Sequence, residues 1–502
     1  MTAGKKKRGW RLGVVFFSCL LGCGGNDVTG EGTGPLRGPE THARHVVVYV
    51  IDTLRADRLG LYGNDRQLTP AMDELGRTGA TFEMAYSSAP WTLPSSVSLF
   101  TSTFPTSHGV LSGLETLGDQ AQTMVEWFGD LGYYTAGFAY NTLGGRGAGL
   151  DQGYDKYFEK PPNDEMTEEQ REQGLHTIRP VLRFIRDYEG EAPLFLYVHT
   201  VEPHWPFDGS PMNLTPLEGE VTGALKEQAN ALCPKHRGML GNRQSGEMTA
   251  QDLAELEEME RTADRLQETV EALYDGDVRR ADLNLSRVVT ALTEKGLWDD
   301  TIFVLLADHG EELRERGNWL HGQSVFNELV RVPMVMRIPG VTGTNSRVSQ
   351  PTQTLDLLPT LADALGAPKA ESWQGRSRYQ WISEPGLPVD AALPIFSVRR
   401  EVDRPGRFVF GDSETTVVRG AWKLIVHHDL RVAALYNLDD DPAERKDVAA
   451  DYPAITASLQ EEVETFLRDQ SALNLSLSQS GPMEEDKRAH LAELGYLGGG
   501  DG

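Results

Sequence analysis

Cysteine is scarce in this chain, and its placement argues against a fold held by disulfides. The 502 residues contain three cysteines, Cys19, Cys23 and Cys233. We expect the first to be removed with an N-terminal leader and the second to be modified at the cleavage point. Cys233 is then alone, so we expect no intrachain disulfide and interpret Cys233 as an incidental thiol.

Positive charge is also in short supply. Lysine and arginine number 48 against 74 aspartates and glutamates, which gives a net charge of −26. Such a balance argues against nonspecific binding of nucleic acid. If the substrate is an anion, the overall field repels it. Local positive charge must then attract it, from a metal ion and from residues such as Arg55.

The N-terminus carries an apolar run that is too short to span a bilayer. Residues 5–8 are basic and precede the apolar residues 12–21, a pattern typical of a secretory signal. The ending Leu20-Leu21-Gly22-Cys23 resembles a bacterial lipobox. We therefore predict a lipoprotein signal peptide over 1–22, lipidation of Cys23 and a flexible tether over 23–44. The expected location is the bacterial cell envelope, anchored by lipid and facing the periplasm or the exterior.

Two apolar runs in the chain end in carboxylates. Residues 45–51 precede Asp52, and residues 301–307 precede Asp308 and His309. Near-continuous apolar runs are typical of buried parallel strands, which deliver the residues after them to one edge of a sheet. Two strand-end aspartates with an adjacent histidine indicate a site for a hard cation with oxygen and imidazole ligands.

Thr92 is predicted to lie at a helix N-terminus. Pro94 follows it by two residues, and Val97, Leu99 and Phe100 occupy the next turns. Backbone N–H groups without intrahelical partners make such a position favourable for anions. A metal ion could activate the hydroxyl as a nucleophile. The alternative is an ordinary N-cap threonine.

Several ordered motifs over roughly residues 45–450 resemble the sulfatase family of the alkaline phosphatase superfamily. They are Asp52-Thr53-Leu54-Arg55-Ala56-Asp57, Thr92-Leu93-Pro94-Ser95, Phe104-Pro105-Thr106-Ser107-His108-Gly109, Glu202-Pro203-His204, Asp308-His309-Gly310-Glu311, Arg331-Val332-Pro333-Met334 and Leu435-Tyr436-Asn437-Leu438 with Asp441-Pro442. The resemblance implies a metal-dependent hydrolase of sulfuric or phosphoric esters.

Site residues follow from the same resemblance. It implies one divalent cation, Ca²⁺, Mg²⁺ or Mn²⁺, with Zn²⁺ left open by the imidazole. The expected ligands are Asp52, Thr53, Thr92, Asp308 and His309. Thr92 is the expected nucleophile, His321 or less favourably His204 the group that protonates the leaving oxygen, and Arg55, Asn141 and His204 the substrate contacts.

The chain departs from the sulfatase pattern at positions that decide the transferred group. Thr92 stands where sulfatases carry the Cys or Ser that becomes formylglycine, and a threonine cannot yield that aldehyde. Ser96 replaces an arginine and Thr53 the second aspartate. The Lys and His that bind sulfate after a Gly-Tyr turn in sulfatases are missing. In this chain Gly132-Tyr133 is followed by Asn141 instead.

These departures leave three hypotheses open. The first is a phosphodiesterase or a phosphoglycerol or phosphoethanolamine transferase, because these members of the superfamily use a threonine nucleophile. A two-metal phosphodiesterase would hold a second ion with His204, His321 and another acid. The third hypothesis is an inactive lipoprotein that binds an anionic ligand or glycan. The expected partners are a small anionic ester or a sulfated or phosphorylated glycan or lipid, and a membrane through the anchor, with no nucleic acid.

The order of apolar segments predicts an α/β fold. We expect a large, mostly parallel sheet with helices on both faces over 45–384, a smaller α+β subdomain over 385–475 and a tail over 476–502. Helices are expected over 249–272 and, separately, around 285–295, with a mixed polar stretch over 209–249. His108 is expected to brace the helix after Thr92, and His199 to be packed rather than catalytic.

Overall fold

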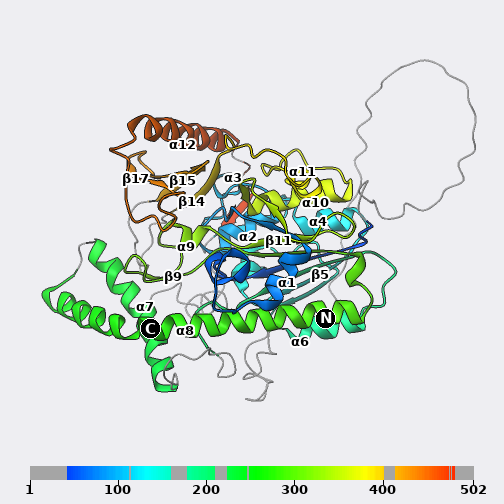
Figure 1. Cartoon of the computed structure of the whole chain (residues 1–502), viewed down its shortest axis with the longest axis horizontal. Coiled ribbons are helices and arrows are strands. Elements are labelled where there is room, and N and C mark those ends of the chain that lie inside the picture. The colour runs from blue at the N-terminus through cyan, green and yellow to red at the C-terminus, as the bar shows by residue number, and fades with distance from the viewer. Residues whose placement is uncertain are drawn as a thin grey trace, which may run out of the picture. The chain divides into compact units, whose positions relative to one another are not determined.

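An eight-stranded sheet forms the core of the chain (Figure 1). The computed structural model describes residues 42–111, 115–159, 178–209, 223–245, 248–400, 413–473, 475 and 477–480. The strand order is β12-β2-β11-β8-β1-β7-β5-β6. The bounds are β1 His45–Ile51, β2 Ala80–Phe82, β5 Tyr134–Ala139, β6 Lys156–Glu159, β7 Leu194–Thr200, β8 Thr301–Ala307, β11 Met334–Arg337 and β12 Ser346–Val348.

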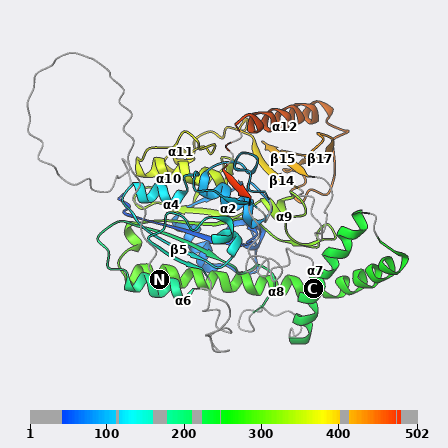
Figure 2. The ribbon, with the colours of Figure 1, turned by 180° about the vertical axis from the view of Figure 1, so that it is seen from behind.

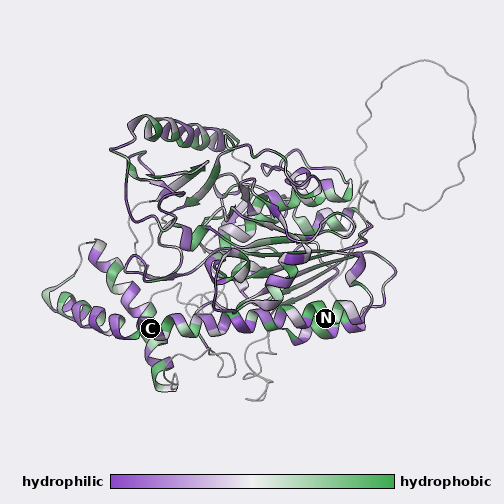
Figure 3. Ribbon diagram, in the orientation of Figure 1, coloured by the Kyte–Doolittle hydropathy of each residue, from purple (hydrophilic) through white to green (hydrophobic). Residues whose placement is uncertain are grey.

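The sheet is mostly parallel, as predicted. β1 lies between β7 and β8 and runs parallel to both, and β5 runs parallel to β6 and β7. β11 runs antiparallel to its neighbours β8 and β2. Every residue of β1, β7 and β8 is buried, which explains why these strands are apolar on both faces (Figure 3).

Helices cover both faces of the sheet (Figures 1 and 2). On one face α8 packs against α1 and α6, and on the other α2 packs against α4 and α10. Their bounds are α1 Pro70–Thr78, α2 Thr92–Thr101, α4 Met124–Asp130, α6 Arg179–Asp187, α8 Ala250–Glu294 and α10 Leu357–Leu365. This layering confirms the predicted α/β class.

The two helices predicted between 249 and 295 are helical, but their separation was wrong, and the structure adds a helix before them. Residues 250–294 form one helix of 45 residues, α8, not two. A glycine such as Gly276 lowers helix stability by about 1 kcal/mol relative to alanine. Gly276 is buried together with Tyr274 and Asp277, and this packing keeps the helix continuous. Within the stretch expected to be mixed and polar, Gly223–Ser245 form a second helix, α7, which packs against α8.

The C-terminal part forms a separate antiparallel sheet, in agreement with the predicted α+β subdomain. Its order is β14 Ile395–Arg399, β15 Glu414–Arg419, β16 Trp422–His427 and β17 Val432–Asn437, and α12 Pro453–Leu473 packs against β15 and β16. β14 bonds to the loop before α2, since the Val398 N–H donates to Ser88 O at 2.9 Å and the Ser397 hydroxyl to Ser87 O at 2.6 Å. The second sheet therefore supports the segment that carries Thr92.

Shorter elements complete the chain. They are β3 Ala85–Tyr86, α3 Pro105–His108, β4 Glu115–Leu117, β9 Glu312–Leu313, β10 Trp319–Leu320, α9 Asn327–Val330, β13 Thr352–Gln353, α11 Tyr379–Ser383 and β18 Ser478–Ser480, with 3-10 turns Ala56–Arg58, Gly60–Tyr62, Thr142–Gly144, Arg146–Ala148, Trp298–Asp300 and Thr354–Asp356. β18, within the expected tail, pairs with β4. The predicted signal, Cys23 and most of the tether lie outside the described residues. Among the described helices, none combines the length and the apolar character that a membrane crossing requires.

Candidate active site

Two aspartates meet at the carboxyl edge of the central sheet. β1 and β8 are parallel neighbours with Ile51 beside Ala307, so the residues that follow, Asp52 and Asp308, leave the sheet together. Both are buried, and Asp52 Oδ1 and Asp308 Oδ2 have no hydrogen-bond partner among the described residues. Buried carboxylates so close together need a cation or a proton to offset their charge.

The turn after β1 has an unusual backbone conformation. Thr53 has a φ of 57°, in the left-handed region that β-branched residues rarely adopt. Its N–H donates to Asp308 Oδ1 at 3.2 Å, which ties this turn to the end of β8. The Tyr274 hydroxyl of α8 donates to Thr53 O at 2.7 Å and accepts from the Arg55 N–H at 3.1 Å. Tyr274 thus holds the turn that carries Asp52.

Thr92 is the first residue of α2, as predicted, and its hydroxyl lies beside His309 and Asn141. Thr92 Oγ1 lies 3.1 Å from His309 Nε2. Asn141 Nδ2 donates to Asp52 Oδ2 at 2.6 Å and to Thr92 Oγ1 at 3.4 Å. Asn141, predicted as a substrate contact, is therefore placed between the proposed nucleophile and a predicted metal ligand.

His309 presents one ring nitrogen to this cluster. Its Nδ1 lies 2.8 Å from Gly310 O, so Nδ1 carries the proton and donates to that carbonyl. Nε2 is then an acceptor, 3.5 Å from Asp52 Oδ1 and 3.6 Å from Asp308 Oδ2. Burial lowers the pKa of His309 to about 3, so the ring is neutral at neutral pH.

His199 also belongs to the cluster, which the sequence did not indicate. It is buried in β7, as expected, but one ligand atom each of Asp52, His199 and Asp308 lie within 4.8 Å of one another. His199 Nε2 lies 3.6 Å from Asp308 Oδ2 and has no hydrogen-bond partner among the described residues, while Nδ1 lies 3.2 Å from the Tyr197 hydroxyl. A histidine inside an apolar strand gives no local signal of such a role.

The electrostatics of this cluster fit a bound cation. Burial raises the pKa of Asp52 well above its usual range, and the charge of Asp308 raises it further. Burial raises the pKa of Asp308 and lowers that of His199 to about 4. Two acceptor carboxylates and neutral imidazole nitrogens, buried with their acceptor atoms unsatisfied, are the donor set that a divalent metal ion takes.

A second group of rings lies beside the first. The His321 ring centroid is 4.5 Å from that of His309 and 4.9 Å from that of His204. Glu311 Oε1 lies 2.9 Å from His321 Nδ1. Burial raises the pKa of Glu311 and lowers that of His321. The two buried groups therefore share one proton between the Glu311 carboxyl and His321 Nδ1. Glu311 belongs to the Asp308-His309-Gly310-Glu311 motif, but no role was predicted for it.

Arg55, predicted to contact substrate, is placed in an ion-pair network. It pairs with Asp57 at 2.7 Å and also with Glu315, and its guanidinium donates to Glu311 O at 2.9 Å. Its substrate contact stays a prediction. His108 lies where it was expected, with Nε2 3.1 Å from the Ser98 hydroxyl of α2.

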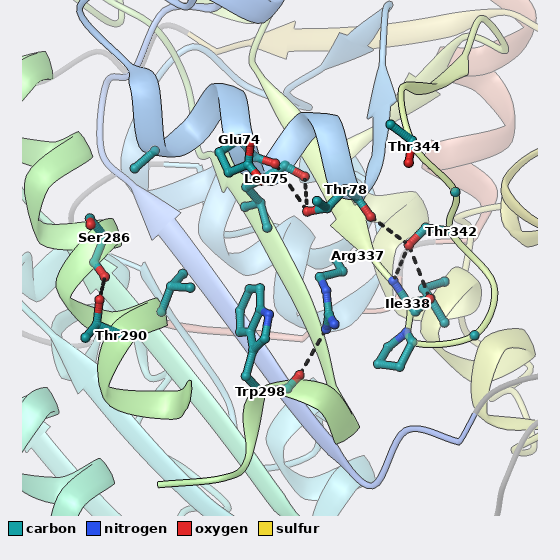
Figure 4. Close-up of a pocket in the computed structure, with 15 residues that line it drawn as sticks. Glu74, Leu75, Thr78, Ser286, Thr290, Trp298, Arg337, Ile338, Thr342 and Thr344 are labelled. Atoms are coloured by element: carbon teal, nitrogen blue, oxygen red, sulfur yellow. Dashed lines mark hydrogen bonds between the residues drawn. The ribbon is translucent and has the colours of Figure 1, made fainter. Parts of the chain in front are cut away.

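A separate cavity of about 610 Å³ opens near the other end of β8 (Figure 4). It lies between α1, α8 and the loop after β11. Its polar lining is internally bonded: the Thr290 hydroxyl donates to Ser286 O at 2.9 Å, the Thr342 hydroxyl to Thr78 O at 3.2 Å, and Arg337 to Trp298 O at 3.0 Å. None of the residues that line it belongs to the Asp52–Asp308 cluster, so we assign it no part in the chemistry.

Comparison with known proteins identifies the family. The family model described as Sulfatase matches residues 44–367, more than half of the chain. The chain belongs to the sulfatase family. It is therefore an ester hydrolase, as predicted, of a metal-dependent family, and the match spans the Asp52, Thr92 and Asp308 motifs.

Individual relatives of this sulfatase-family chain have different chemistry in their names. An arylsulfatase from Clostridium perfringens is 24% identical over 392 residues, which cover 68% of this chain and 78% of that protein. The phosphonate monoester hydrolase of Agrobacterium radiobacter has a similar fold, with a TM-score of 0.66, 21% identity, and 85% and 96% of the two chains covered. BT4656, solved with its substrate D-glucosamine-2-N,6-O-disulfate, has a TM-score of 0.66, 19% identity, and 87% and 99% coverage.

Proposed function

We propose that this chain is a metal-dependent hydrolase of sulfate or phosphate esters with Thr92 as its nucleophile. The observation that carries the proposal is the position of the Thr92 hydroxyl, at the N-terminus of α2 and 3.1 Å from the neutral Nε2 of His309. The helix N-terminus favours the anionic ester, and the neighbouring acceptors favour loss of the hydroxyl proton.

Asp52, Asp308 and His199 would hold one divalent cation, with the hydroxyls of Thr53 and Thr92 as further oxygen donors. His309 Nε2 would join them only where it does not accept the Thr92 proton. Bound there, the ion would lower the pKa of the Thr92 hydroxyl and offset the negative charge of the ester. His199 adds a second imidazole to the predicted ligand set. Imidazole suits Zn²⁺ better than Ca²⁺, Mg²⁺ or Mn²⁺, whereas the carboxylates suit the latter three, so the second histidine strengthens the case for Zn²⁺.

The chain's own residues then divide the work. The Thr92 hydroxyl gives its proton to His309 Nε2, and its oxygen forms a bond to sulfur or phosphorus in line with the departing oxygen, whose bond breaks. His321, oriented by Glu311 at 2.9 Å, supplies the proton that the departing oxygen needs. Asn141 holds both Thr92 and Asp52, which fixes the nucleophile relative to the carboxylates.

Release of the covalent ester decides which substrates to test first. Threonine forms no aldehyde hydrate, so water or another hydroxyl must attack the sulfur or phosphorus of the Thr92 ester. This favours phosphonate monoesters and phosphodiesters over aryl sulfates. A phosphonate monoester hydrolase among the structural neighbours supports that choice, and a sulfated-sugar substrate in another keeps sulfated glycans second. An alcohol in place of water would make the reaction a transfer.

The test is turnover by Thr92→Ala and Thr92→Ser. Each variant is measured against 4-nitrophenyl phenylphosphonate, bis-4-nitrophenyl phosphate and 4-nitrophenyl sulfate. Thr92→Ala should lose activity by at least about 10³-fold and keep its metal content, whereas Thr92→Ser should retain activity and accumulate a covalent adduct visible as added mass on residue 92. Undiminished turnover in Thr92→Ala would contradict the nucleophile assignment.

A further inference from the structure

Helix α7 places a cation on the wall of the catalytic cluster. Its residue Arg237 donates from Nη2 to the backbone oxygen of His321 at 2.8 Å, although 84 residues separate the two along the chain. His321 is the residue whose ring lies beside His309 and His204. A guanidinium from a distant helix is thus hydrogen-bonded to the backbone just after β10, at the proposed proton donor.

The same guanidinium lies close to the start of α2. A Cβ built on Gly322 would lie 3.8 Å from Arg237 Nη2 and 3.7 Å from the Cβ of Trp91. Trp91 is the N-cap of α2 and directly precedes Thr92. Both are ordinary van der Waals distances, so Gly322 lies between Trp91 and Arg237, and the Arg237 guanidinium is near the residue that precedes Thr92.

Arg237 brings positive charge to a site rich in buried acids. Asp52, Asp308 and Glu311 all lie within the cluster. Burial raises the pKa of Glu311, and the charge of Arg237 acts in the opposite direction. Arg237 is partly exposed, unlike these acids. It lies on the His321 side, where the departing oxygen receives its proton.

We propose that Arg237 is a specificity-determining residue that binds a second negative charge, carried by the leaving group of the ester. The preferred substrates are then esters of an alcohol that is itself anionic, such as a sugar with a second sulfate or a carboxylate. This deepens the proposed function and rests on it for the identity of the leaving-group side. A charge-assisted hydrogen bond of this kind changes affinity by about tenfold.

The experiment measures binding in the Thr92→Ala background, so that probes are not consumed. Calorimetry compares N-acetyl-D-glucosamine-6-O-sulfate with D-glucosamine-2-N,6-O-disulfate at one ionic strength. Thr92→Ala should bind the disulfate about tenfold more tightly. Adding Arg237→Gln should reduce that ratio to about one, and Arg237→Lys should restore part of it. Lys235→Gln is the matched control, because Lys235 lies on the same helix, is 62% exposed and pairs with Glu255.

Three outcomes would overturn the proposal. They are equal loss of affinity for both probes in Arg237→Gln, an unchanged ratio in that variant, and no preference for the disulfate in Thr92→Ala. Binding does not require the Thr92 hydroxyl, so these outcomes are separate from failure of the proposed function. That failure would appear as undiminished turnover in the single variant Thr92→Ala.

Discussion

Single residues in the Asp52–Asp308 cluster leave polar atoms without hydrogen bonds to other described residues, where burial makes that unfavourable. Asp52 and Asp308 each keep one carboxylate oxygen without a hydrogen-bond partner in the described part of the chain, and His199 Nε2 is in the same condition. Unsatisfied buried groups cost free energy, about 1–3 kcal/mol each and more when charged. A fold retains such a cluster when a ligand repays that cost, which is why the metal is the first property to test.

Asp308→Asn should lose the bound metal. Relative to the wild type it should be more stable without metal and less stable with metal added. The metal-free variant should unfold at a higher temperature than the metal-free wild type, by a few degrees, because the charge that raises the pKa of Asp52 is gone. Added metal should no longer raise its melting temperature. Elemental analysis after dialysis and thermal unfolding measure both effects. Asp299→Asn, exposed before β8, is the charge control, and unchanged metal content in Asp308→Asn would contradict the site.

The two histidines can be separated by the same measurement. His309 Nε2 has one lone pair, which either accepts from Thr92 or binds the ion. His199→Ala and His309→Ala should each lower metal affinity if both are ligands. Metal loss in His199→Ala with full occupancy in His309→Ala would instead assign His309 to the Thr92 proton.

Glu312 gives a pH-dependent stability. Burial raises its pKa to about 7 from 4.5, while Gln323 donates to it at 2.8 Å. The folded state therefore holds the proton more tightly than the unfolded state. This stabilising contribution is complete below about pH 4.5 and is lost as the pH rises through about 7. Glu312→Gln should match the wild type near pH 5 and exceed it in unfolding free energy at pH 8, by at most about 3 kcal/mol. Urea titrations at both pH values measure the difference, and a pH-independent difference would contradict the assignment.

At the scale of elements, the long helix α8 positions the turn that carries Asp52. Tyr274 lies at its centre and is fully buried, and its hydroxyl makes two bonds to the backbone of residues 53 and 55. Those bonds hold Thr53 at its positive φ, from which its N–H reaches Asp308. The helix therefore acts on the site through the backbone, without a side chain in the metal cluster.

Tyr274→Phe should weaken metal binding several-fold, since the turn loses its only described side-chain hydrogen bonds to Thr53 O and the Arg55 N–H. It should also destabilise the fold by about 1–3 kcal/mol. The control is Tyr62→Phe, whose hydroxyl donates to Phe82 O at 2.8 Å and accepts from the Met334 N–H at 3.0 Å. That variant should lose similar stability with unchanged metal affinity. Metal titration of both proteins checks this, and equal affinities would show that Tyr274 is merely structural.

At the scale of the whole molecule, the open property is where the enzyme works. We predict that Cys23 is lipidated and that the enzyme is held on the outer side of a membrane by that group. Each buried CH₂ contributes about 0.8 kcal/mol, so several acyl chains give firm attachment. Cys23→Ala should release the protein or leave it unprocessed, as fractionation and intact mass would show. A wild-type protein found soluble in the cytoplasm with residues 1–22 attached would contradict this.

Local pattern was enough for the frame of the enzyme. The strands before Asp52 and Asp308, and the start of a helix at Thr92, follow from apolar runs and a proline position that act within a few residues. Parallel strands bring their ends together, so the meeting of the two aspartates could be predicted as well. The C-terminal sheet followed from similar short-range signals.

Tertiary structure decided what depends on contacts between distant segments. His199 lies in an apolar run like any packed histidine, and it joins the cluster because β7 pairs with β1. Arg55 is drawn into ion pairs by Asp57 and Glu315, whereas Arg237, in a stretch without a readable motif, reaches His321 because α7 folds back over β10. Spacing along the chain specifies which residues share an edge or a face. Which charged side chain reaches the site depends on how helices far apart in the sequence pack together. That packing cannot be predicted from the residue pattern of any short segment.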